Sequence, residues 1–169
     1  TREISLARND KAKIGEVFAA IMIIKSVLII IAFSILYFVV NTFTRFSVDA
    51  EVYLLSFGVV IGQALFPVWF FQGIEKMKFV TFINILAKVI FTVLVFILIK
   101  SESDYFKVPI YNSLGFIVSG LIGFALSFQY FEFRLPKTSL IKQLLVESYS
   151  LFVSNFASSM YTASNVFIL

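Results

Sequence analysis

The sequence predicts an all-α fold, a polytopic bundle of transmembrane helices with five spans in a single membrane domain, residues 1–169. Hydrophobic residues make up 60% of the chain and charged residues 14%, whereas soluble domains are about 45–50% apolar and about 25% charged. The apolar residues also gather in runs of about 20, the length that a helix needs to cross roughly 30 Å of hydrocarbon. None of these runs shows the alternation of period two that membrane-spanning strands require.

The first span, about 15–40, carries a charged residue in its interior. Lys25 lies well inside the run and has no aligned polar neighbour beyond Ser26. A lysine in such a position either packs or snorkels to the interface, or it faces a hydrated cavity. Both interpretations stay open for Lys25.

The second span, about 51–71, contains a proline near its end. Pro67 has no backbone N–H to donate to the carbonyl of Gln63, so we predict that the helix kinks there. Ser56 and Gln63 lie on roughly the same face as Pro67. Gln63 is therefore a candidate for lining a cavity beside the kink.

The third span, about 79–99, carries the most informative pattern. Thr81, Asn84, Lys88 and Thr92 recur at spacings of three and four residues, which places them on one helical face. A lone lysine at mid-membrane costs roughly 2.5–3.5 kcal/mol on insertion scales. We therefore predict that this polar stripe faces a cavity. The alternative is a lysine that snorkels or pairs with a carbonyl or carboxylate elsewhere.

The fourth span, about 108–130, is predicted to be a packing helix. Gly115, Ser119, Gly123 and Ser127 follow one another at four-residue spacing. Small residues in such a row let a neighbouring helix approach closely. We assign no ligand to them.

The fifth span, about 149–169, is the most polar of the five. A helix of this kind is costly against lipid unless water or neighbouring helices satisfy its polar groups. We predict either that it lines a hydrated cavity or that it hydrogen-bonds extensively with other helices, and both interpretations stay open. The polar residues that share one face are Ser154, Ser158, Thr162 and Asn165.

The basic residues are distributed unevenly between the loops. Nine of the 14 lysines and arginines lie in the segments 1–14, 72–78 and 131–148, and three lie in the loops 41–50 and 100–107. The positive-inside rule therefore predicts that the N-terminal segment is cytoplasmic. After Pro136, apolar residues share one face, which predicts a short interfacial amphipathic helix at about 136–147. A solvated linker is the alternative.

Several chemistries are excluded by what the chain lacks. It has no Cys and no His, which excludes disulfide frameworks, zinc sites of Cys/His type and His-based acid–base catalysis. No Asp or Glu lies in the interior of a predicted span, so we predict no enzyme active site, no metal and no cofactor. The net charge of +4 is spread over loops that flank apolar runs, so no nucleic acid is predicted as a partner.

Three stretches of the chain carry a family resemblance: TREISLARNDKAKIGEVF, FPVWFFQGIEKMKFVTFINILAKVIF and LFVSNFASSMYTASNVFIL. Together they resemble bacterial polysaccharide-repeat-unit (O-antigen) flippases of the multidrug/oligosaccharidyl-lipid/polysaccharide (MOP) exporter superfamily. The most specific part is the Trp-Phe-Phe-Gln-Gly hinge followed by a lysine in the next helix. The resemblance implies a transporter of two lobes, of which this chain is a fragment that covers most of the first lobe.

The resemblance also implies a function in lipopolysaccharide biosynthesis at the bacterial inner membrane. It implies a flippase that moves a polyprenyl-diphosphate-linked oligosaccharide between leaflets by alternating access. Coupling to a proton or sodium gradient, and other envelope polysaccharide assembly proteins as partners, are implied as well. Lys88 and Lys25 suit a substrate that carries phosphates, whereas a cationic drug would need carboxylates, which disfavours a drug exporter of the same superfamily. The alternative of another class is a non-transporting membrane subunit whose polar stripes only join helices.

Overall fold

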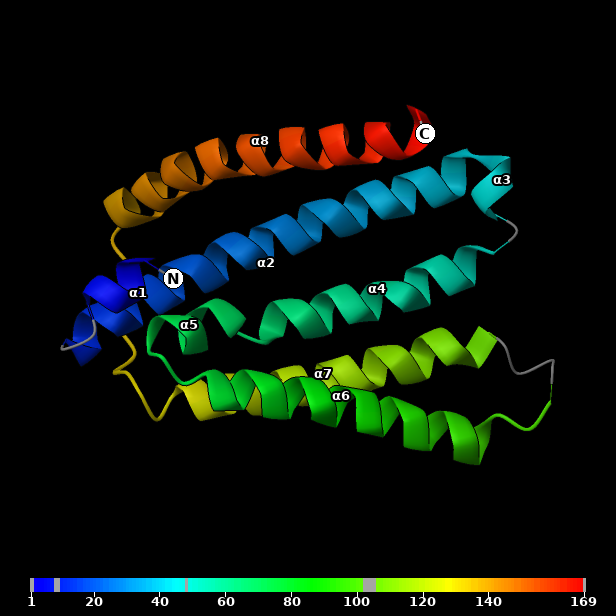
Figure 1. Ribbon diagram of the computed structural model, residues 1–169, viewed down its shortest axis with the longest axis horizontal. Coiled ribbons are helices and arrows are strands. Elements are labelled where there is room, and N and C mark those ends of the chain that lie inside the picture. The colour runs from blue at the N-terminus through cyan, green and yellow to red at the C-terminus, as the bar shows by residue number, and fades with distance from the viewer. Residues whose placement is uncertain (1, 8–9, 48, 102–105, 169) are drawn as a thin grey trace.

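The computed structural model describes residues 2–7, 10–47, 49–101 and 106–168, and the regular structure in these ranges is helical (Figure 1). Four helical segments, α2, the α4–α5 pair, α6 and α7, are long and apolar enough to cross a membrane by length and composition. The predicted all-α membrane fold is therefore confirmed. The helices are α1 (Arg2–Leu6), α2 (Lys11–Thr42), α3 (Thr44–Ser47), α4 (Ala50–Leu65), α5 (Val68–Gly73), α6 (Met77–Leu98), α7 (Val108–Ser127) and α8 (Thr138–Ile168).

The last helix differs from our prediction in two ways. We predicted an interfacial helix at about 136–147 and a separate span at about 149–169, but α8 runs without a break through both. It contains neither Gly nor Pro, so nothing in it ends the helix. Its serines and asparagines make it less apolar than the other long helices, and the described residues contain four candidate spans rather than five. Figure 1 nevertheless shows α8 running alongside α2 for most of its length.

The long helices lie side by side in the order α8, α2, α4, with α6 and α7 together at the far edge (Figure 1). Helix α7 packs against both α4 and α6, while α2 packs against α4 and α8. The short α1 and α5 contact one another at the end of the bundle where α6 begins.

Small residues set the close approach of α7 to its neighbours. A Cβ atom on Gly120 would lie 2.3 Å from the backbone oxygen of Gly62 on α4. A Cβ atom on Gly115 would lie 2.7 Å from the backbone oxygen of Ala87 on α6. The predicted packing face is therefore confirmed, since it lets two backbones meet with no side chain between them. Its four predicted residues are all buried: Gly115, Ser119, Gly123 and Ser127.

The predicted kink at Pro67 is also confirmed, as a complete break between two helices. Helix α4 ends before Phe66 and α5 begins at Val68. The N–H of Val68 donates to the carbonyl of Phe66 at 2.9 Å, rather than to the carbonyl of Ala64 as it would in a continuous helix. Both the proline and this turn leave α4 carbonyls without their usual helical donors.

An aromatic core holds the α5 end of the bundle together. Phe18 of α2 and Phe70 of α5 are at most 2% exposed. The ring centroid of Phe18 lies 5.3 Å from that of Phe70 and 4.5 Å from that of Phe131, in the α7–α8 linker. Ring pairs at such distances contribute about 0.5–1.5 kcal/mol each beyond their buried area. The cluster therefore fixes α5, and the hinge that follows it, against α2.

The same end of the bundle holds the three segments in which most basic residues lie. The start of α2, the α5–α6 hinge and the α7–α8 linker meet there, whereas α3, the end of α6 and the start of α7 lie at the opposite end (Figure 1). The charge asymmetry predicted between loops is thus an asymmetry between two ends of one bundle. That this basic end is cytoplasmic stays a prediction of the positive-inside rule.

Candidate functional site

The polar stripe predicted on the third span is a surface of α6. On a neighbouring face of α6, Ile83 is 1% exposed and Ala87 is 3% exposed, and both pack against α7. Helix α6 is therefore attached by its apolar side and presents its polar side outward. The exposed polar residues are Thr81, Asn84, Lys88 and Thr92.

Lys88 lies in a shallow groove of about 250 Å³ on this face. It stands near the middle of α6, about 16 Å along the axis from the first residue of the helix. Among the residues that the structure describes, none accepts a hydrogen bond from its ammonium group or forms an ion pair with it. The groove thus combines one unpaired cation with apolar walls. It is lined by Ile85, Lys88, Val89, Thr92 and Val93.

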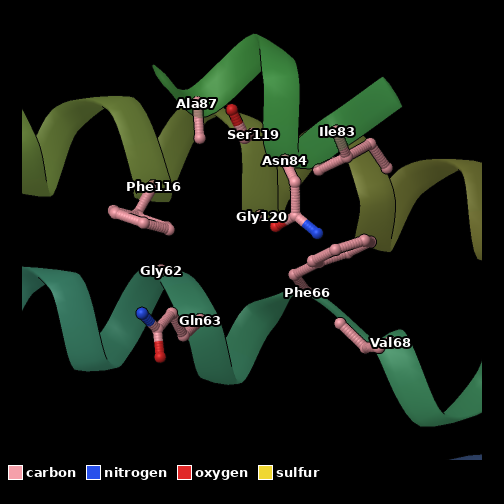
Figure 2. Close-up of a pocket in the computed structure, with 10 residues that line it drawn as sticks. All are labelled: Gly62, Gln63, Phe66, Val68, Ile83, Asn84, Ala87, Phe116, Ser119 and Gly120. Carbon is pink, nitrogen blue, oxygen red and sulfur yellow. The ribbon is translucent and has the colours of Figure 1, made fainter. Parts of the chain in front are cut away.

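Asn84 and Gln63 line one cavity of about 240 Å³ between α4, α6 and α7 (Figure 2). Figure 2 shows the amide of Asn84 reaching from α6 toward the gap between the rings of Phe116 and Phe66. The side chain of Gln63 points away from that gap. The structure therefore brings both predicted residues to one cavity, but only Asn84 extends into it. The lining comprises Gly62, Gln63, Phe66, Val68, Ile83, Asn84, Ala87, Phe116, Ser119 and Gly120.

Ser119 lines this cavity and is a site residue that the sequence did not reveal. Its side chain is 2% exposed, and its hydroxyl has no hydrogen-bond partner among the described residues. The four-residue spacing indicated a packing role for Ser119, which its burial fits. Phe66 and Phe116 gave no signal beyond hydrophobicity, whereas the break at Pro67, one turn from Gln63, could have located the cavity.

A small neutral cavity with aromatic walls and one amide suits an uncharged hydrogen-bonding group.

Lys25 is held inside the bundle by α4 and α5. Its ammonium nitrogen lies 3.4 Å from the backbone oxygen of Ala64 and 6.0 Å from the centroid of the Trp69 ring. The Ala64 carbonyl is one that the break at Pro67 deprives of its helical donor. These contacts favour the packed interpretation of Lys25, in which its charge serves the α4–α5 break.

The polar candidates on the last helix lie far from those on α6. Ser158 is exposed on α8, and α2 and α4 stand between α8 and α6 (Figure 1). Thr162 and Asn165 belong to the same helix, but their side chains lie outside the described residues. Within this chain, the polar faces of α6 and α8 are therefore not brought together.

Comparisons with known proteins indicate the family to which this helical bundle belongs. A family model described as "Polysaccharide biosynthesis protein" matches residues 1–169. Two curated relatives, from Escherichia coli (strain K12) and Shigella dysenteriae, each carry the name "Putative O-antigen transporter". They are 29% identical over 173 residues and 30% identical over 171 residues, respectively, and both alignments cover 100% of this chain.

The chain spans only part of these relatives, 41% of the first and 43% of the second. No solved structure matches the chain significantly. Because the family model matches from the first residue to the last, the chain belongs to the polysaccharide biosynthesis protein family.

Proposed function

We propose that this chain is part of a flippase that moves a polyprenyl-diphosphate-linked oligosaccharide across the bacterial inner membrane. The cargo would be an O-antigen or other polysaccharide repeat unit, carried by alternating access. Family membership, the four apolar helices and the names of the two relatives support this proposal. The positive-inside rule supports a cytoplasmic N-terminal segment.

The observation that carries the proposal is Lys88 on the exposed face of α6. A lysine near the centre of an apolar helix is costly, and packing does not explain this one, since it is exposed while α6 buries Ile83 and Ala87. Thr81, Asn84 and Thr92 extend the polar face along the helix. Such a face suits a polar ligand or a hydrated cavity rather than hydrocarbon.

The sign of the charge selects the substrate class. A diphosphate carries negative charge that an ammonium group attracts, and hydrogen bonds to charged groups contribute about 1.5–3 kcal/mol. Lys88 supplies this attraction, because Lys25 already donates to the Ala64 carbonyl. A cationic drug would find no carboxylate on the described face of α6.

Alternating access requires that one body of helices rocks against another about a central site. The glycine contacts join α4, α6 and α7 into one closely packed body, and the Lys88 face points outward from it. We propose that this face lines the path between this body and the remaining part of the protein. Coupling to a proton or sodium gradient belongs to the same proposal.

Charge removal at Lys88 in the full-length protein tests the proposal. In a bacterial strain that lacks its own repeat-unit flippase, Lys88→Gln should reduce surface polysaccharide at least tenfold, because a charged hydrogen bond of about 1.5 kcal/mol or more is lost. Lys88→Arg should retain most export. The readout is surface polysaccharide on gels, normalised to the amount of the protein in the membrane.

Lys100→Gln serves as the matched control, because it removes the same charge from the end of α6 rather than from its middle. It should leave export near the wild-type level. Export by Lys88→Gln at the wild-type level would defeat the charge-attraction proposal for Lys88. Absence of export by the unsubstituted protein would instead favour a subunit whose polar residues only join helices.

A further inference from the structure

A second basic hollow lies at the hinge between α5 and α6, away from the groove that holds Lys88. It has a volume of about 590 Å³ and is lined by the α5–α6 hinge, the start of α6, the end of α7 and the linker after α7. Figure 1 shows these segments at one end of the bundle. Neither the predicted site residues nor the cavity of Figure 2 contributes to it. We call it the hinge hollow. Its lining comprises Glu75, Lys76, Lys78, Phe79, Phe82, Leu126 and Tyr130.

The backbone of the hinge holds the lysines of this hollow in place. The N–H of Lys76 donates to the carbonyl of Phe71 at 2.8 Å, and the N–H of Glu75 donates to that of Gln72 at 3.2 Å. Glu75 itself adopts a φ of 59°, a conformation that non-glycine residues adopt mainly in tight turns. Since Phe71 belongs to the aromatic core, the backbone of Lys76 is attached to a buried residue of that core.

The electrostatics of the hollow favour an anion. Lys76 and Lys78 are both exposed and outnumber the single carboxylate, Glu75. Lys76 is also the N-cap of α6, which has no side-chain cap and no acidic residue in its first turn. The partial positive charge at the start of this helix therefore adds to that of the lysines.

The opposite wall of the hollow is aromatic and apolar. Phe82 is 60% exposed, and the rings of Phe79 and Tyr130 lie 6.2 Å apart. Tyr130 carries a hydroxyl that can hydrogen-bond beside an apolar ring, as tyrosines at membrane interfaces do. Cations at the rim and rings on the wall match an amphipathic molecule with an anionic head, rather than a free ion.

We propose that the hinge hollow binds the phosphate group of a lipid headgroup. Lys76 and Lys78 contact the phosphate, and Phe79 and Phe82 contact the first segments of the lipid chain. Lys78 lies ten residues before Lys88 on α6, about 15 Å along the axis, with Thr81 between them on the same side. The hollow therefore provides a first contact for a phosphate-bearing lipid that then moves along α6. That this lipid is the one that the flippase carries rests on the proposed function, whereas the binding of a lipid phosphate in the hollow does not.

Binding is measured on the full-length protein in nanodiscs of neutral phosphatidylcholine, with a fluorescent short-chain polyprenyl diphosphate as the probe. Fluorescence anisotropy gives the dissociation constant. Removing both charges in Lys76→Gln/Lys78→Gln should weaken binding roughly 30-fold, at about 1 kcal/mol per lysine near a membrane surface. Glu75→Gln should strengthen binding about fivefold, because it removes the opposing charge. Lys100→Gln/Lys107→Gln, which removes two charges from the opposite end of α6 and α7, should leave binding unchanged.

Competition separates the sources of the phosphate. Added phosphatidylglycerol that displaces the probe would assign the hollow to anionic phospholipid in general, and failure to displace it would assign the hollow to the diphosphate lipid. Displacement by inorganic diphosphate in solution at a similar concentration would overturn the proposed lipid contacts. Unchanged binding in Lys76→Gln/Lys78→Gln would overturn the site, while the export defect of Lys88→Gln would still support the flippase. Weakened binding together with no export by the unsubstituted protein in the strain that lacks its own flippase would keep the hollow and reject the proposed function.

Discussion

The contact between Gly120 of α7 and Gly62 of α4 makes the sharpest stability prediction of the structure. In an unobstructed helix interior, Gly→Ala gains about 0.8–1 kcal/mol because alanine restricts the unfolded backbone. At position 120, however, the new Cβ would lie 2.3 Å from the backbone oxygen of Gly62 and 3.2 Å from its carbonyl carbon. We therefore expect the sign of the effect to be reversed.

The magnitude follows from how far the helices must move. A carbon atom normally stays about 3.3–3.6 Å from a carbonyl oxygen, so α4 and α7 would have to separate by about 1 Å at this point. Backbone atoms cannot rotate away as the end of a side chain can. Overpacking of this kind costs typically 1–3 kcal/mol. Gly120→Ala should lower the free energy of unfolding by that amount, and Gly62→Ala, whose Cβ would lie 2.4 Å from the backbone of Phe116, should behave in the same way.

Gly123→Ala is the matched control, since it makes the same substitution one turn further along α7. Its Cβ would meet Phe66 Cδ2 at 2.6 Å and Ile83 Cδ1 at 3.0 Å. Both atoms belong to side chains rather than to the backbone, and Ile83 Cδ1 is the end of its side chain. The control should therefore lose less than about 1 kcal/mol, because the gain in helix propensity offsets a smaller repulsion.

The assay is unfolding of the full-length protein in mixed micelles with an increasing fraction of denaturing detergent, followed by circular dichroism. Export should fall with stability in Gly120→Ala, because Gly62 and Gly120 both line the cavity of Figure 2. Wild-type stability of Gly120→Ala would refute the steric explanation, as would a larger loss of stability in Gly123→Ala than in Gly120→Ala.

Two further predictions concern polar groups inside the bundle. Lys25→Met should lower the free energy of unfolding by about 1–3 kcal/mol in the same assay, because it leaves the Ala64 carbonyl without a donor. If Lys25 instead bound the substrate, this variant would keep its stability and lose affinity for the fluorescent polyprenyl diphosphate. Ser113→Ala should cost about 0.6 kcal/mol, since the Ser113 hydroxyl donates to the Leu55 carbonyl at 2.7 Å. Ser119→Ala on the same helix should be neutral or stabilising, because it removes a buried hydroxyl that has no partner among the described residues, and equal losses in the two serine variants would contradict this contrast.

The helices and their small-residue contacts could be predicted because they follow from local rules. The length of the apolar runs predicted the apolar helices. The missing N–H of Pro67 predicted the break after α4, and the four-residue spacing of small residues predicted the packing face of α7. The division of the region from about 136 to 169 into two helices was an error of a different kind. Hydropathy changes near residue 148, but a helix ends at a breaker or a cap rather than at a change in polarity, and α8 contains neither Gly nor Pro.

The candidate site could be predicted only where one helix determines it. The stripe from Thr81 to Thr92 is exposed as a unit because its residues share one face of α6. The cavity that Asn84 enters depends on where α4 and α7 pass α6, which no single segment encodes. For the same reason, the sequence could not identify Ser119 as a residue of the cavity. A small residue on a packing face has the same sequence pattern whether or not a cavity lies beside it.

The two interior lysines show why neighbouring helices decide the role of a buried charge. Both stand well inside apolar runs, and hydropathy alone assigns them the same cost. Lys25 lies beside a break that exposes a carbonyl 39 positions away in the chain, so its charge completes the hydrogen bonding of α4. Lys88 is exposed on α6, whose buried residues Ile83 and Ala87 lie on another face. A lysine engaged by a backbone carbonyl is a weaker attractant for phosphate, because its donor is already directed elsewhere. In the proposed flippase, the mid-helix charge that attracts an anionic headgroup is therefore that of Lys88, and the lysines of the hinge hollow stand at the start of the same helix.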